Sequence, residues 1–150
     1  MIKKGLTSII FILACTSAVS AYSNGYEIVK NIKTCIGIED VRIIRATGFD
    51  KVLREWIKSE ADNENRSVTL QRDKTGAYIA ISLPKVKNST FNDDIFKKIE
   101  DCINAKDVCI METKNSKLIK TWMKEEEYKK RNISINYEKK TGIYTAVSTP

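Results

Sequence analysis

Apolar positions along residues 24–84 follow two periods, one typical of helices and one typical of strands. Two stretches carry the helical period, formed by Ile28, Ile32, Cys35 and Ile36 in the first and by Val52, Leu53, Trp56 and Ile57 in the second. The segment VRIIRA between them is typical of a strand, as are the two alternating runs on either side of the turn sequence DKTG. The pattern therefore predicts the order helix, strand, helix, strand, strand.

The same pattern occurs again in the second part of the chain. EIVKNIKTCIGIEDVRI aligns with DIFKKIEDCINAKDVCI at an offset of 67 residues, and KTGAYIAISLP aligns with KTGIYTAVSTP at an offset of 66. Each change of offset is a single residue and falls where we expect a loop or turn. The identical residues predicted to lie in the core are Cys35 and Cys102, Trp56 and Trp122, and Tyr78 and Tyr144.

These matches predict a tandem duplication of one αβαββ unit. The first unit is expected at residues 24–84 and the second at residues 91–150, with a linker at residues 85–90. Each unit is expected to form a three-stranded sheet covered by its two helices, which places the fold in the α+β class. Asp50 and Ser116 are the expected N-caps of the second helix in each unit.

The last strand of the first unit has one face that is kept in the second unit and one that changes. Alternate residues of a strand point to opposite faces, so the unchanged Tyr78, Ala80 and Ser82 share a face, which we expect to lie under the helices. The other face is formed by Ile79, Ile81 and Leu83. Such an apolar row needs a cover, which we expect from the second unit or, alternatively, from a partner protein.

Residues 1–21 have the three-part layout of an export signal. Lys3 and Lys4 give a short cationic start, an apolar run follows over residues 6–14, and small residues end at Ala21, where cleavage is expected. The apolar run is too short to span a bilayer comfortably. We therefore expect a periplasmic or secreted protein.

A lipid anchor is the alternative. The segment ILAC resembles a bacterial lipobox, in which Cys15 would become the lipidated first residue, although Leu13 is bulkier than that motif usually accepts. An uncleaved signal that remains as an anchor is a third alternative.

The net charge of the chain and its distribution limit the classes of partner that we expect. The chain has 26 Lys and Arg against 19 Asp and Glu, a net charge of +7, and removal of residues 1–21 would lower it to +5. The two signs are interleaved, as in KEEEYKKR, which is typical of a solvated surface. We expect no nucleic-acid partner, and membrane contact only through a lipid anchor or a weak attraction to anionic lipids.

The absence of histidine removes most catalytic arrangements. The sequence has no histidine, no Gly-rich phosphate loop and no Cys-x-x-Cys motif. The commonest general base, the commonest zinc ligand and the Ser-His and Cys-His pairs are therefore missing. We predict a protein that is not an enzyme and has no cofactor or metal site.

The cysteines leave an odd count once Cys15 is set aside, so at least one thiol is expected to be free or to bond another molecule. Cys35 and Cys102 both fall on the apolar helical faces, where unbonded core thiols are one interpretation. Cys109 is expected on the opposite, outward face of its strand. The two residues Cys102 and Cys109 are close in sequence. We nevertheless predict them as the disulfide, because the helix end is short and a shift of one residue in the strand would turn Cys109 toward Cys102.

Read from the second helix of the first unit, the order αββαβ resembles the BON and ring-building modules of exported bacterial envelope proteins, without the glycine that BON domains carry after their second strand. A shared order of elements does not carry a function. Our first functional hypothesis is a non-catalytic module that binds or assembles with other proteins of the envelope through a sheet face or strand edge. An immunity-type protein that neutralises a toxin in the periplasm is the alternative function. A small secreted enzyme is the third hypothesis.

Overall fold

The computed structural model describes residues 25–85, 94–103 and 107–150. The predicted export signal, Cys15 and most of the predicted linker lie outside the described residues. The described part of the chain belongs to the α+β class, with four α-helices and one antiparallel sheet of six strands. Within these residues, no helix is long and apolar enough to cross a membrane.

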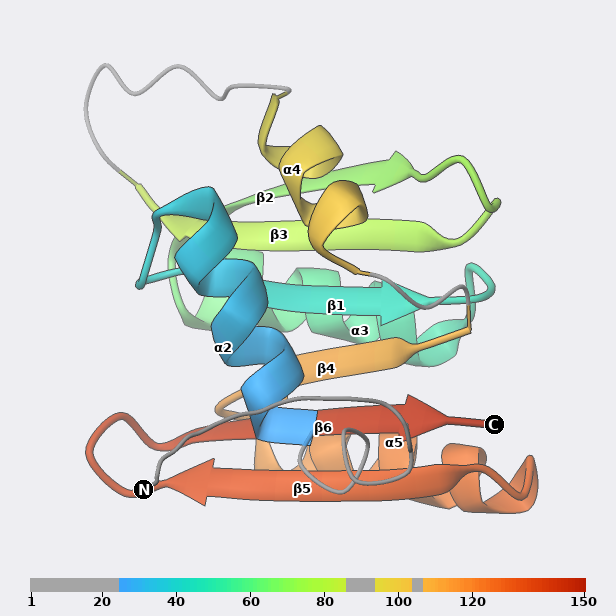
Figure 1. Cartoon of the computed structure of the whole chain (residues 1–150). Coiled ribbons are helices and arrows are strands. Elements are labelled where there is room, and N and C mark those ends of the chain that lie inside the picture. Colours follow the sequence, from blue (N-terminus) through green and yellow to red (C-terminus); the bar gives the residue numbers. More distant parts are fainter. Residues whose placement is uncertain (1–24, 86–93, 104–106) are drawn as a thin grey trace, which may run out of the picture.

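The elements follow one another in an order that alternates helices with single strands and hairpins (Figure 1). In chain order they are α2 (Gly25–Ile36), β1 (Arg42–Ala46), α3 (Lys51–Lys58), the π-helical turn η1 (Ser59–Asn63), β2 (Arg66–Arg72), β3 (Tyr78–Pro84), α4 (Asp94–Cys102), β4 (Cys109–Thr113), α5 (Ser116–Tyr128), β5 (Asn132–Glu138) and β6 (Ile143–Thr149). We call residues 25–85 the first half and residues 94–150 the second half.

The six strands form one continuous sheet with the order β2-β3-β1-β4-β6-β5. The expected three-stranded sheets are thus not separate, because β1 pairs with β4 and joins the strands of the two halves. This seam is short: β1 and β4 pair at Ile44–Met111 and Arg45–Ile110, whereas β1–β3 and β4–β6 each pair over five residues.

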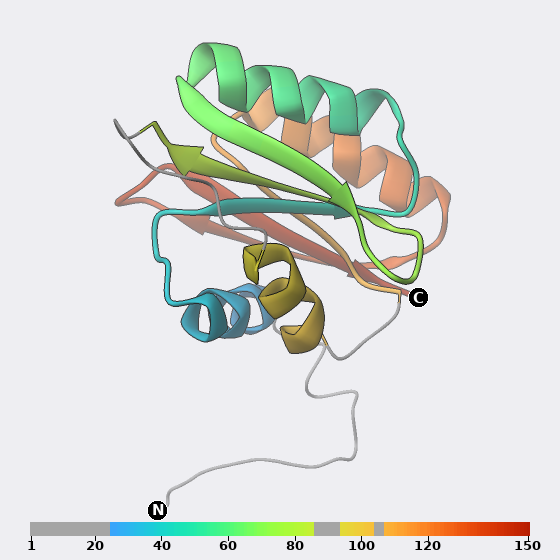
Figure 2. The same ribbon diagram turned by 90° about the horizontal axis from the view of Figure 1, so that it is seen from above.

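Helices cover both faces of the sheet (Figure 2). Helices α2 and α4 lie on one face, and α3 and α5 lie on the other. The expectation that both helices of a unit share one face is therefore wrong. The apolar residues divide accordingly into two cores, one on each side of the sheet.

The predicted interaction row on β3 is buried. Ile79 is 1% exposed and Ile81 is fully buried, and both pack with Phe96 and Ile99 of α4, while Leu83 is partly buried against the same core. A partner protein is not needed to cover this row, because α2 and α4 already do so. On the opposite face, Ala80 is fully buried in the core beneath α3 and α5.

Helix α2 lies across the strands of the second half. It contacts α4, β6 and β5, so its N-terminal part covers the edge of the sheet farthest from β2 and β3 (Figure 1). Helix α4, from the second half, lies over β3. The first helix of each half thus covers strands of the other half, and the halves share their core on this side.

The local signals in the sequence mostly correspond to the observed turns and caps. Asp50 caps α3 by accepting a hydrogen bond from the backbone N–H of Leu53 at 3.0 Å. Helix α5 is capped by Asn115 rather than by Ser116, because the Asn115 side chain accepts from the N–H groups of both Lys117 and Leu118. Gly76 and Gly142 adopt φ values of 90° and 74° in the two hairpins, as the turn sequences predict.

The π-helical turn η1 has a simple cause in the sequence. The first half has one more residue between Glu60 and Arg66 than the second half has between Glu126 and Arg131. The extra residue widens the end of the helix into a π turn, in which the N–H of Glu64 bonds the carbonyl of Ser59 at 3.2 Å. One change of offset therefore falls in a helical turn rather than in a loop.

Candidate functional site

A buried ion cluster lies at the start of β2 in the first half. Glu60 is fully buried, and Nη1 of Arg42 lies 3.1 Å from both of its carboxylate oxygens. Arg66 donates from Nε to Ser82 Oγ at 2.7 Å and from Nη1 to Asp40 Oδ1 at 2.9 Å, and its Nε lies 3.7 Å from Glu60 Oε1. The opposite charges and hydrogen bonds allow Glu60, Arg42 and Arg66 to remain buried, whereas the Asp40 side chain is 67% exposed.

A second cluster of the same design lies in the second half. Arg131 donates to Ser148 Oγ and Asp107 Oδ1, and also to the backbone carbonyls of both residues, as Arg66 does with Ser82 and Asp40. Glu126 is 3% exposed and accepts from Ser148 Oγ at 2.6 Å. Its cationic partners are Lys129 and Arg131, whose Nζ and Nε atoms each lie 3.3 Å from one of its carboxylate oxygens.

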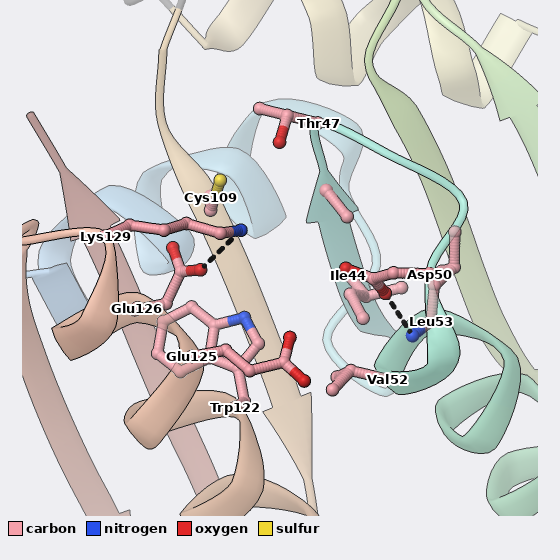
Figure 3. A pocket seen from close by; sticks show the side chains of 11 residues that line it. Ile44, Thr47, Asp50, Val52, Leu53, Cys109, Trp122, Glu125, Glu126 and Lys129 are labelled. Atoms are coloured by element: carbon pink, nitrogen blue, oxygen red, sulfur yellow. Dashed lines mark hydrogen bonds and ion pairs between the residues drawn. The ribbon is translucent and has the colours of Figure 1, made fainter.

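The two clusters differ at one strand position. Cys109 of β4 aligns with Arg42 of β1, so Glu126 has no arginine beside it from the strand. Figure 3 shows Cys109 next to the Glu126–Lys129 pair, in the space between α3 and α5. This cavity of about 10 Å³ has room for one water molecule at most.

Cys109 is a free thiol that is 4% exposed. Burial and the Glu126 carboxylate raise its pKa above the ordinary value of 9.0, against the effect of Arg131 and Lys129. Because the thiolate is the reactive form, this side chain remains a protonated core thiol at neutral pH. The sequence correctly placed Cys109 opposite Val108 and Ile110, but that face is a second core, not solvent.

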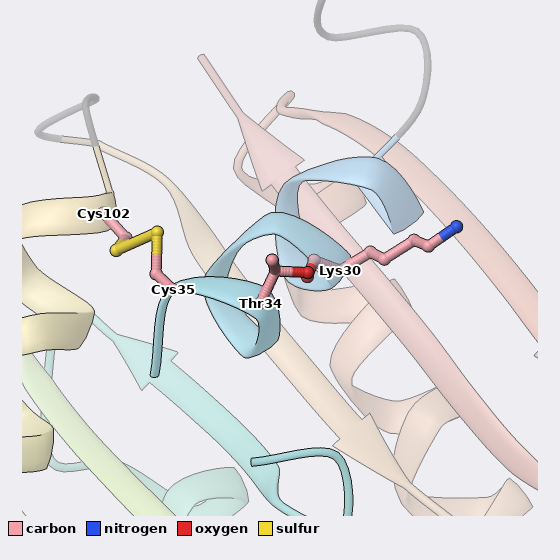
Figure 4. The surroundings of a disulfide bond; sticks show 4 residues. All are labelled: Lys30, Thr34, Cys35 and Cys102. Carbon is pink, nitrogen blue, oxygen red and sulfur yellow. A yellow bond between two sulfur atoms is a disulfide. The ribbon is translucent and has the colours of Figure 1, made fainter. Parts of the chain in front are cut away.

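The predicted Cys102–Cys109 bridge is wrong. Cys102 instead bonds Cys35, with 6.6 Å between the two Cα atoms, and the disulfide joins α2 to α4 (Figure 4). The interpretation of Cys35 and Cys102 as core thiols is wrong as well, since Cys35 is exposed and Cys102 is partly buried at the rim of the core. The bridge closes a loop between the two halves.

The remaining residues that were matched between the units lie where the sequence placed them. Trp56 is fully buried and Trp122 is 4% exposed, in the core under α3 and α5. Tyr78 and Tyr144 are partly buried against the same core. Trp56 also donates from Nε1 to the Glu112 carbonyl at 2.6 Å, which ties α3 to the seam of the sheet.

Buried charges of opposite sign face the seam between β1 and β4. Arg45, which is 2% exposed, donates from Nη1 to the carbonyl of Val108 at 2.5 Å and forms an ion pair with Asp73 at 3.0 Å. At the matched position of β4, Glu112 accepts from the N–H of Ile43 at 3.1 Å. Both side chains thus bond backbone groups where the short ladder between the strands ends.

Glu112 also forms the floor of a small cavity under α2. Lys33 lies 2.7 Å from its Oε2 atom, and Tyr26, Lys30, Glu138 and Thr145 line the space above, which measures about 80 Å³. Burial raises the pKa of Glu112 above its ordinary value of 4.5, although Lys33 and the Ile43 N–H act in the opposite direction. Glu112 and Lys33 thus form an ion pair beneath α2. No cluster of three or more metal-ligating side chains occurs among the described residues.

Two of the four large apolar side chains that are exposed among the described residues lie on β5, one edge of the sheet; the other two are Phe49, before α3, and Tyr128. Ile135 is 38% exposed, Tyr137 is 50% exposed, and both lie on the face that α5 covers only in part. The Tyr137 ring lies 4.6 Å from that of Tyr144 on the neighbouring strand. Tyr128 at the end of α5 is 90% exposed.

The opposite edge of the sheet, β2, lacks this exposed row. Leu70, which pairs with Ala80 as Ile135 pairs with Ala146, is partly buried in the core. The counterpart of Tyr137 is Arg72, whose guanidinium lies 5.1 Å above the Tyr78 ring. Sequence reasoning did not single out Ile135 and Tyr137; their alternation with polar residues and the change from Arg72 to Tyr137 were the available signals.

Known proteins add no assignment to this site. No protein-family model matches the chain, and no curated protein matches it either.

Proposed function

We propose that this protein is an exported, non-catalytic binding module of the bacterial envelope, built by tandem duplication of one αβαββ unit. It holds a partner protein at the β5 edge of its sheet. The observation that carries the proposal is the exposed apolar row of β5, since the matched positions on β2 are partly buried or charged. Exposed apolar and aromatic side chains at one place on a surface are typical of protein contacts.

The duplication is supported by features that chance alignment does not explain. Arg66 and Arg131 make the same set of bonds to a serine and an aspartate at matched positions. The strand order is β2-β3-β1 on one side of the seam and β5-β6-β4 on the other, which has the form of an internal two-fold arrangement. After a duplication, one copy can keep its original surface while the other acquires a new one.

Export is supported by the layout of residues 1–21 and by the Cys35–Cys102 disulfide. Disulfides persist in oxidising compartments such as the bacterial periplasm. The mass of the mature N-terminus tests this part: cleavage after Ala21 fits a free protein, and a lipidated Cys15 fits a membrane anchor. An intact first residue would contradict processing.

The binding function is tested by capture from an envelope extract under non-reducing conditions. Wild-type protein and Ser67→Lys, a substitution on the exposed part of the β2 edge, should retain the same partner. Ile135→Lys on β5 should lose it, because a charge placed in the exposed apolar row opposes desolvation. Equal capture by all three proteins would contradict the β5 site, and the identity of the partner separates assembly from toxin neutralisation.

A further inference from the structure

We propose that the partner segment is an extended strand with acidic residues near its ends, which adds to β5 as a seventh strand of the sheet. This inference rests on the proposed function and names the chemistry of its partner. Among the described strands, β5 has a neighbour on one side only, and it extends over seven residues. An edge strand of this length offers backbone groups on its outer side to an incoming strand.

The side chains on one face of β5 determine which residue types a paired partner strand needs on the same face. Ile133, Ile135 and Tyr137 alternate along β5 and point to the side of the sheet that carries α5. In a strand pair, side chains on the same face lie opposite one another, and apolar or β-branched residues stabilise aromatic and isoleucine neighbours. The partner strand is therefore apolar at alternate positions on this face.

The charges around β5 select acidic residues at the ends of that strand. Lys130 precedes β5, and Lys139 and Lys140 follow it; all three are exposed and enter no ion pair among the described residues. The one acid of β5, Glu138, is outnumbered at this end by Lys139 and Lys140, so the net charge there is positive. Positive charge at both ends of the strand favours an acidic partner and increases its rate of association.

The β2 edge does not offer the same charges. Asn65 precedes β2 where Lys130 precedes β5, and Asp73, which lies 3.0 Å from Arg45, follows β2 where Lys139 follows β5. Of the three lysine positions around β5, the β2 edge therefore keeps one. Lys74, which aligns with Lys140, is an exposed lysine that follows β2 and serves as a matched control.

A second copy of this chain fits the β5 edge poorly. If two β5 strands paired in antiparallel fashion about Ile135, Lys130 and Arg131 of one copy would lie beside Lys140 and Lys139 of the other. Like charges placed opposite each other across two strands are destabilising. The same lysines that favour an acidic strand therefore disfavour self-association.

The experiment uses two synthetic peptides and the mature protein. The acidic probe is acetyl-Asp-Glu-Val-Thr-Val-Thr-Val-Glu-Asp-amide, and the basic probe carries Lys at each acidic position. Fluorescence anisotropy of labelled peptides should show saturable binding of the acidic probe, weakened by salt, and at least about tenfold weaker binding of the basic probe.

Substitutions locate the binding. Tyr137→Arg, which copies the β2 edge, should weaken binding of the acidic probe by about tenfold or more, as loss of an aromatic anchor does. Lys140→Glu should weaken it and Lys74→Glu should not. Circular dichroism of each variant confirms that it is folded.

The outcomes separate this inference from the proposed function. Equal binding of both probes, or no binding while capture of a natural partner still depends on Ile135, would overturn the acidic strand and leave the binding function in place. Loss of both peptide binding and Ile135-dependent capture would overturn both. A concentration-dependent dimer that Tyr137→Arg dissociates would replace the acidic strand by a second copy.

Discussion

The ion clusters around Glu60 and Glu126 use the same serine, aspartate and arginine positions. They differ in how much of the second cationic side chain beside the glutamate is exposed to solvent. The Arg42 side chain beside Glu60 is 5% exposed, whereas the Lys129 side chain beside Glu126 is 47% exposed. The same contrast holds at the sheet edges, where Arg72 covers Tyr78 in the first half while Tyr137 leaves an aromatic surface open in the second. At the ion cluster and at the sheet edge the first half is therefore the more closed copy, although Phe49 of that half is 46% exposed where it packs on the Tyr78 ring.

The largest expected effect comes from breaking the disulfide that joins the halves. Cys35→Ser should lower the free energy of unfolding by up to about 4 kcal/mol, because the bridge closes a loop of 67 residues whose freedom is restored in the unfolded chain. Urea unfolding followed by circular dichroism measures this loss.

Reductant provides the control for that measurement. It should reproduce the loss in the wild-type protein and have no further effect on Cys35→Ser. If the free energy of unfolding does not change on reduction, the disulfide contributes no stability, and the shared core under α2 and α4 alone holds the two halves together.

The next effect distinguishes the two ion clusters. Glu60→Gln should lower the free energy of unfolding by about 3 kcal/mol, since it leaves the buried Arg42 without its main partner. Glu126→Gln should cost about 1–2 kcal/mol, because Lys129 can turn into water, and Arg131, although it loses Glu126, keeps Asp107 and the Ser148 carbonyl. The midpoints of urea unfolding of the two variants measure these losses. Equal losses of stability would contradict the conclusion that the Glu60 cluster is the more buried of the two.

The charges at the seam predict opposite responses to pH. Although partial burial opposes it, the Thr75 hydroxyl and the Arg45 guanidinium lower the pKa of Asp73 below 3.8. Its contribution to stability is therefore present above that pH and lost as the pH falls through the lower folded pKa. Burial raises the pKa of Glu112 above 4.5, so its contribution is present below that pH and lost as the pH rises through the folded pKa.

Unfolding measured across this pH range separates the two groups. Asp73→Asn should remove part of the loss of stability in acid, and Glu112→Gln should remove part of the decline above pH 4.5. A Glu112→Gln profile parallel to that of the wild type would mean that Lys33 keeps the carboxylate ionised throughout.

Periodicity in the sequence predicted the elements well but not the side of the sheet on which each helix lies. The apolar faces of Ile32 and Trp56 each indicate a helix with one buried side, and nothing in their spacing distinguishes the two faces of a sheet. The better signal was in β3, where Ile79 and Ala80 are both buried, because a strand with two apolar faces is covered on both sides.

The disulfide and the exposed edge depend on long-range arrangement. Cys35 and Cys102 meet only because α2 crosses to the other half, which no local pattern specifies. Ile135 and Tyr137 become an edge only because β6 rather than β5 pairs with β4. The sequence could match these residues to Leu70 and Arg72, but the strand order decides what solvent reaches.

The smallest expected effect is the exchange of Arg72 and Tyr137 between the two edges. Tyr137→Arg should change the free energy of unfolding by less than about 1 kcal/mol, since an arginine above Tyr144 can replace the ring contact by a cation–π contact. Arg72→Tyr should be similarly mild, because a tyrosine can stack on Tyr78 as Tyr137 stacks on Tyr144.

The two changes lie at opposite edges of the sheet, so their effects on unfolding in urea should add within about 0.5 kcal/mol in the double variant. A loss above about 2 kcal/mol for Tyr137→Arg would show that the ring is needed for folding. If Tyr137→Arg changes the free energy of unfolding only slightly, the variant is still folded, as expected for a side chain that the first half already carries at the matched position. Loss of binding in Tyr137→Arg is then caused by the changed surface of β5 and not by unfolding.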